Sequence, residues 1–68
     1  MKYRIFEQQN MSSVREYSHE FEGTLTAAKR FASRNQVWHG TVLAIETETG
    51  LPVSHKKYGK WTDNPFYA

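Results

Sequence analysis

The chain has 68 residues, a formal net charge of +2 and no cysteine. A chain of this length forms one domain, residues 1–68, which buries only about 60% of its unfolded surface and therefore has a thin core. Without cysteine there is no disulfide or thiolate site. The longest apolar runs fall far short of the roughly 20 residues that a membrane-spanning helix requires.

Two strands are predicted in the first third of the chain, Lys2 to Gln8 and Val14 to Glu22, with a polar loop between them. In the first strand, Tyr3 and Ile5 share one face. The second strand alternates cleanly, which is typical of a half-buried strand. Its outer face carries Glu16, Ser18, Glu20 and Glu22. We expect these two strands to form a hairpin.

A helix is predicted from Thr24 to about Arg34 or Asn35. Thr24 suits the N-cap because its hydroxyl can accept from an unpaired N–H of the first turn. Asn35 suits the C-terminal end because asparagine tolerates the left-handed conformation. Helical spacing gathers apolar side chains on the inner side of this helix. They are Leu25, Ala28, Phe31 and Ala32.

Three further strands are predicted in the second half of the chain. Val37 to Glu46 carries apolar groups on both faces and is expected to be central, with Gly40 marking a bulge or a close approach. Leu51 to Lys57 and Lys60 to Thr62 follow, separated by short turns. The order β-β-α-β-β-β predicts an α+β fold, a single antiparallel sheet of about five strands with one helix packed on one face.

Catalysis is poorly supported by this sequence. The histidines lie at positions 19, 39 and 55, which is no metal-ligand spacing, and neither a phosphate-binding loop nor a nucleophile motif is present. The acidic row of the second strand is best interpreted as a solvated face. We therefore expect no enzyme, no catalytic residue, no metal site and no cofactor.

The helix supplies the strongest functional signal. From Thr24 to Gly40 the chain holds Lys29, Arg30 and Arg34 and no acidic residue. Surface helices often carry such charges simply for solvation. The one-signed patch nevertheless favours a surface for a negative partner, and Lys56 would add to it if the fold brings the two segments together.

Gln36 and Trp38 follow the basic helix directly. Arginine beside an aromatic ring and an amide is a composition suited to protein interfaces or nucleic acid. Both Trp38 and Tyr3 could instead belong to the core, and the sequence leaves the two alternatives open.

A resemblance extends from about Tyr3 to Asp63. It is carried by Leu25 to Arg30, Ala32-Ser33, Gly40 to Val42 with Ile45, and Gly59 to Asp63. These segments resemble the ninth-numbered family of type I-F anti-CRISPR proteins, which are small proteins of phages and mobile elements that evade a host defence.

The resemblance implies a non-enzymatic inhibitor that acts in the cytoplasm of the bacterial host cell. Its partner would be the RNA-guided type I-F surveillance complex, called Csy or Cascade. The inhibitor would wedge against the backbone subunits that hold the guide RNA and stop target DNA from pairing with it. The inhibited complex could still hold duplex DNA without sequence preference.

The resemblance also implies roles for individual residues. Gln36 and Trp38 would contact the backbone subunit, assisted by Tyr3. The DNA-facing basic positions would be Lys29, Arg30, Arg34 and Lys56. A slightly basic chain is no broad DNA mimic, so steric occlusion is the consistent mechanism. The alternative is a small autonomous nucleic-acid-binding module of a phage or mobile element, which uses the same basic helix.

Overall fold

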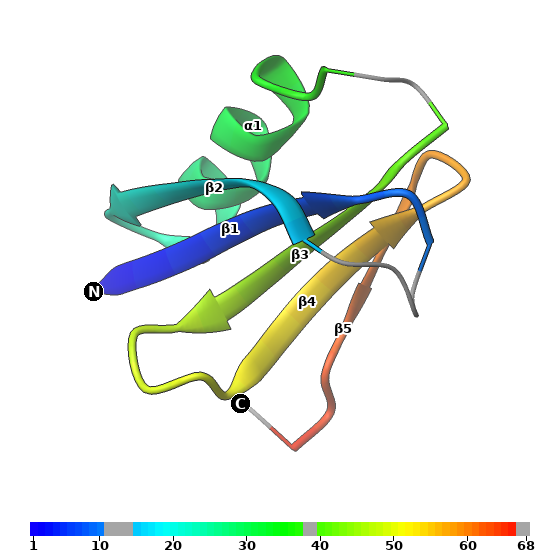
Figure 1. Ribbon diagram of the computed structural model, residues 1–68. Helices are drawn as coiled ribbons and strands as arrows, with labels where there is room; N and C mark the ends of the chain where they lie inside the picture. Colours follow the sequence, from blue (N-terminus) through cyan, green and yellow to red (C-terminus); the bar gives the residue numbers. More distant parts are fainter. Residues whose placement is uncertain (11–14, 38–39, 67–68) are drawn as a thin grey trace.

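The computed structural model describes residues 1–10, 15–37 and 40–66, with no account of the side chains of residues 15–17. Six elements follow one another along the chain (Figure 1). They are β1 Lys2–Gln8, β2 Arg15–Glu22, α1 Leu25–Arg34, β3 Val42–Thr47, β4 Pro52–Lys57 and β5 Lys60–Asp63. Within the described ranges, no helix is long and apolar enough to cross a membrane.

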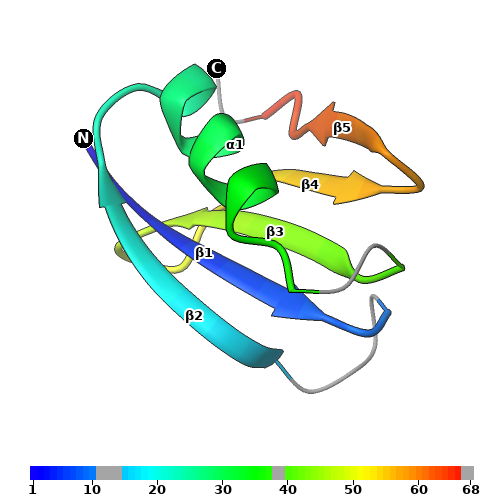
Figure 2. The same ribbon diagram turned by 90° about the horizontal axis from the view of Figure 1, so that it is seen from above.

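The strands form one antiparallel sheet in the order β2-β1-β3-β4-β5, which confirms the predicted α+β fold. The third predicted strand is indeed central, since β3 lies between β1 and β4. Because β2 and β3 both pair with β1, the connection between them crosses one face of the sheet, and α1 forms that connection (Figure 2).

The core lies between α1 and this face of the sheet. Ile5 of β1 stands opposite Ile45 of β3, and both are fully buried. Ala28 and Ala32 are the buried residues of α1, and their small side chains let the helix lie close to the strands. The cap predicted at Thr24 is confirmed, since its Oγ1 accepts from the Ala27 N–H at 3.1 Å.

Asn35 ends the helix as predicted, but with φ −99° rather than in the left-handed region, and both its backbone N–H and its Nδ2 donate to the Phe31 carbonyl. Two other local predictions were wrong. Gly40 lies outside any strand, and a Cβ there would meet nothing within 4 Å, so neither a bulge nor a close approach requires this glycine. The strand expected from Val37 begins only at Val42.

Candidate functional site

Side chains predicted to face DNA line a groove between α1 and β5. Figure 2 shows where these two elements lie in the fold. Arg30 and Arg34 lie one helical turn apart on α1 and are exposed. The lining consists of Thr26, Lys29, Arg30, Ser33, Arg34 and Trp61. The helix supplies all of these residues except Trp61.

Lys56 joins this surface from β4. Its register opposite Leu43 places it on the helix-covered face of the sheet, and its Nζ donates to Ser33 Oγ at 3.0 Å. The fold thus brings together the helix and a lysine that follows it by more than 20 residues in sequence. We call the set Lys29, Arg30, Arg34, Lys56 and Trp61 the basic groove.

An acidic residue of β5 pairs with a lysine of the basic groove. Lys29 Nζ lies 2.7 Å from Asp63 Oδ1 and 5.8 Å from the centre of the Trp61 ring. The hydrogen bond from Lys29, and after it the one from Ser54 Oγ at 2.7 Å, hold the pKa of Asp63 below its ordinary value. The helix segment itself has no acidic residue, but the fold brings Asp63 beside it. The charge of Lys29 is therefore partly neutralised.

A buried carboxylate organises the chain between α1 and β3. Glu7 of β1 is only 4% exposed. Its Oε1 and Oε2 accept from the Val37 N–H at 2.9 and 3.2 Å, and Oε2 also accepts from Thr41 Oγ1 at 2.7 Å. Gln36 Nε2 in turn donates to Thr41 Oγ1 at 3.1 Å and to the Thr41 carbonyl at 3.3 Å. We call these four residues the Glu7 junction.

The Glu7 junction explains why β3 begins late. A buried carboxylate needs hydrogen-bond donors, and Val37 and Thr41 supply them from the backbone and a hydroxyl. Because the Val37 N–H donates to Glu7, Val37 does not join the hydrogen-bond ladder of the sheet, and the chain turns before Val42. The half-buried Gln36 side chain is consequently held in one orientation at the end of the helix.

The sequence did not single out Glu7, although it contains a signal. Glu7 has the same parity in β1 as Tyr3 and Ile5, which are both buried. An acidic residue on the buried face of an amphipathic strand requires an internal partner. That pattern could have indicated a buried polar anchor.

The three residues predicted to contact a protein partner have different environments. Gln36 belongs to the Glu7 junction. Tyr3 lies in the core with 5% of its surface exposed, so of the two alternatives the structure supports the core for this residue. Its assignment as an assisting contact stays a prediction. Trp38 lies outside the described residues.

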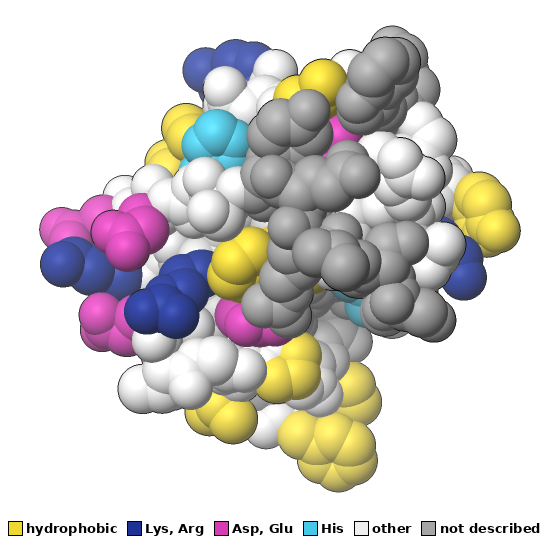
Figure 3. Space-filling model, in the orientation of Figure 1, with side chains coloured by type: hydrophobic (Ala, Val, Ile, Leu, Met, Phe, Trp, Pro, Cys, Tyr) yellow, Lys and Arg dark blue, Asp and Glu magenta, His cyan; other side chains and the backbone are white. Residues whose placement is uncertain are grey.

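The sheet face opposite α1 carries mixed charges. The register sets Glu20 of β2 opposite Arg4 and Glu22 opposite Lys2. Basic and acidic side chains accordingly alternate on this face over β1 and β2 (Figure 3). The exposure of Glu20 and Glu22 agrees with the interpretation of this row as a solvated face.

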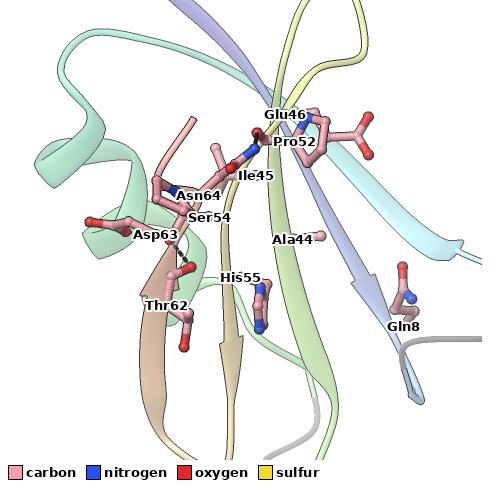
Figure 4. Close-up of a pocket in the computed structure, with 11 residues that line it drawn as sticks. Gln8, Ala44, Ile45, Glu46, Pro52, Ser54, His55, Thr62, Asp63 and Asn64 are labelled. Atoms are coloured by element: carbon pink, nitrogen blue, oxygen red, sulfur yellow. Dashed lines mark hydrogen bonds between the residues drawn. The ribbon is translucent and has the colours of Figure 1, made fainter. Parts of the chain in front are cut away.

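A second hollow lies over the strands on this open face (Figure 4). Ala44, His55 and Thr62 contribute to its lining from three neighbouring strands, and none of the lining residues is lysine or arginine. Among the described residues, no group of three histidine, cysteine or acidic side chains is placed to hold a metal ion. The basic groove and the Glu7 junction are therefore the candidate sites.

Among solved structures, a chain named AcrIF9 is similar to this protein over nearly its whole length. The match has a TM-score of 0.79 and 45% sequence identity, and it covers 94% of this chain and 86% of that chain. No family model and no curated protein matches.

Fold and sequence together define a type I-F anti-CRISPR protein of the small α+β kind. At this identity and coverage the relationship is one of family, and the chain belongs to the AcrIF9 family. The resemblance identified from the sequence is thereby confirmed.

Proposed function

We propose that this protein binds the type I-F surveillance complex at the backbone subunits that hold the guide RNA and sterically blocks target DNA from pairing with that RNA. The observation that carries the proposal is the separation of charge near the end of α1. In the Glu7 junction, the carboxylate of Glu7 accepts hydrogen bonds from within the protein. In the neighbouring groove, Arg30 and Arg34 are exposed.

A channel that binds guide RNA is itself positively charged. The basic groove would be repelled by such a channel, so it cannot compete by imitating DNA. The Glu7 junction has no such conflict, and it presents Gln36 in a fixed orientation at little entropic cost on binding. We therefore assign Gln36 and Trp38 to the contact with the backbone subunit, with Tyr3 supporting them from the core.

The basic groove then faces outward, towards DNA. Arg30 and Arg34 would contact phosphates of a duplex without reading its sequence. Lys29 and Lys56 extend the positive surface, although each already has a partner within the protein. Duplex DNA held in this way would depend strongly on salt, because each phosphate contact releases counterions.

Size-exclusion chromatography of purified surveillance complex mixed with this protein tests the proposal. The protein should co-elute with the complex, and guide-directed binding of target DNA should be lost. Absence of co-elution, or co-elution with undiminished target binding, would contradict the proposed function.

The alternative is an autonomous nucleic-acid-binding module, which the exposure of Arg30 and Arg34 favours. It predicts tight, salt-sensitive binding of DNA or RNA by the isolated protein, centred on the basic groove. Duplex binding that requires the complex would instead favour the inhibitor.

A further inference from the structure

The turn between β4 and β5 combines three features that do not favour folding. Tyr58 and Gly59 form a two-residue loop in which both have positive φ, 54° and 78°, as in a type I′ turn. Tyrosine is a costly residue there, since asparagine or glycine adopts this conformation more readily. The Tyr58 side chain is also 92% exposed, so it gains almost no burial in return.

The charges at this turn add a third cost. Lys57 and Lys60 stand directly opposite each other in the register of β4 and β5. Like charges at opposite positions of an antiparallel pair destabilise it. Lys57 Nζ lies 5.4 Å from the centre of the Tyr58 ring, which keeps one of the two ammonium groups beside the aromatic surface.

The turn is also accessible. Pairing between β3 and β4 extends to Lys56, so residues 57–60 project beyond the central strand as a two-stranded ribbon. The preceding rung of this ribbon pairs Lys56 with Trp61, and both residues belong to the basic groove. Because side chains alternate between the two faces of a ribbon, Lys57 and Lys60 point to the face opposite Lys56 and Trp61, and the tip is a charged surface separate from the basic groove.

We propose that the tip formed by Lys57, Tyr58, Gly59 and Lys60 is a contact site for single-stranded nucleic acid, separate from the duplex contact assigned to the basic groove. An exposed ring between two lysines matches the composition of single-strand binding surfaces, in which a base stacks on the ring while cations meet the flanking phosphates. Bases of a duplex already stack on one another, which favours an unpaired strand as the occupant.

The test is an NMR titration of the isolated protein with oligothymidylate at low salt. The contact has a single stacking position and is expected to be weak. Backbone amide signals of residues 57–60 should shift more than those of residues 29–34. An oligonucleotide with abasic sites in place of the thymines should shift them much less, because it keeps the phosphates but lacks the bases.

Tyr58→Asn is the decisive variant because it removes the ring and suits the turn. It should lower the affinity for oligothymidylate about tenfold, which is the size of one lost base stack, while the melting temperature stays equal or rises. The matched control is Phe66→Asn, which removes another exposed aromatic, 95% exposed, outside the tip. The control should leave the affinity unchanged.

Lys57→Gln with Lys60→Gln should also weaken binding and reduce its salt dependence. The control Lys2→Gln with Arg4→Gln removes the same charge elsewhere. It should weaken binding and reduce its salt dependence less than the tip variant does. Absence of shifts at the tip in the wild-type protein, or equal affinities for wild type and Tyr58→Asn, would overturn the proposal. Tip variants that weaken only co-elution with the surveillance complex would make the tip a protein contact and overturn it as well.

This outcome is independent of the inhibitor proposal. The titration contains no surveillance complex. Binding of oligothymidylate can therefore be absent while the protein co-elutes with the complex, and it can be present while co-elution fails. Shifts confined to residues 29–34 would support the autonomous module and would count against the tip.

Discussion

The Glu7 junction follows the C-terminal end of α1, the basic groove runs along the helix, and the two are held in opposite ways. The junction depends on one buried carboxylate that accepts from Val37 and Thr41. The groove depends on the exposed Arg30 and Arg34 and on the half-buried Lys29, whose charge is balanced by Asp63 at the surface. The comparison shows that one surface is fixed from the interior of the protein, whereas the other needs little more than charge placed on a rigid helix.

The largest effect is expected at Glu7. Glu7→Ala leaves the Val37 N–H and the Thr41 hydroxyl without their acceptor, which should lower the free energy of unfolding by about 2–4 kcal/mol. In a domain of this size that corresponds to a fall in melting temperature on the order of 10–20 °C. Urea denaturation measures the change.

Glu48→Gln is the matched control for Glu7, because Glu48 is an exposed acid in a turn. Its effect on stability should stay within about 0.5 kcal/mol. If Glu7→Ala were as stable as the wild-type protein, the junction would not be held by the carboxylate.

Charge reversal in the groove should have the next largest effect. Arg30→Glu with Arg34→Glu should weaken duplex DNA retention by the inhibited complex at least about tenfold and reduce the salt slope by about 1.8, since each phosphate contact contributes about 0.9. Filter binding across a salt series measures both quantities. An unchanged slope would show that these arginines do not meet phosphates.

Asp63→Asn should act in the opposite direction. Removal of this charge releases Lys29 from its 2.7 Å pair, so duplex affinity should rise about threefold, as expected for the loss of an exposed pair worth up to roughly 1 kcal/mol. The same filter-binding series measures the rise. A fall in affinity would mean that Asp63 positions Lys29 for DNA.

The smallest effect concerns the titration of Asp63. Its pKa in the folded state lies below the unfolded value, so the pair with Lys29 stabilises the fold fully above about pH 4 and ceases to do so as the pH falls through the folded pKa. The contribution is small because the Asp63 side chain is 59% exposed. NMR titration should find a lowered pKa that rises in Lys29→Gln; equal pKa values in both proteins would exclude the lysine as the main cause.

Much of the fold follows from local patterns. Alternation in β1 and β2, the cap at Thr24 and the two alanines of α1 each specify their own element, and short turns make the pairing antiparallel. The helical part of the basic groove could be predicted for the same reason, because Arg30 and Arg34 are separated by one helical turn and need no distant partner.

The remaining features depend on contacts between residues far apart in sequence. Glu7 and Val37 are 30 residues apart, and no local pattern at Val37 indicates that its N–H leaves the strand ladder. Lys29 and Asp63 likewise meet only when β5 packs beside α1. Charge counted along one segment therefore overestimated the net positive charge of the groove.

The most direct test of the division between the two surfaces compares two variants in one assay. Surveillance complex is titrated with Gln36→Ala and with Arg30→Glu/Arg34→Glu, and guide-directed binding of target DNA is measured. The account predicts that Gln36→Ala loses inhibition, whereas the doubly charge-reversed protein inhibits like the wild type. Equal loss of inhibition by both variants would contradict it.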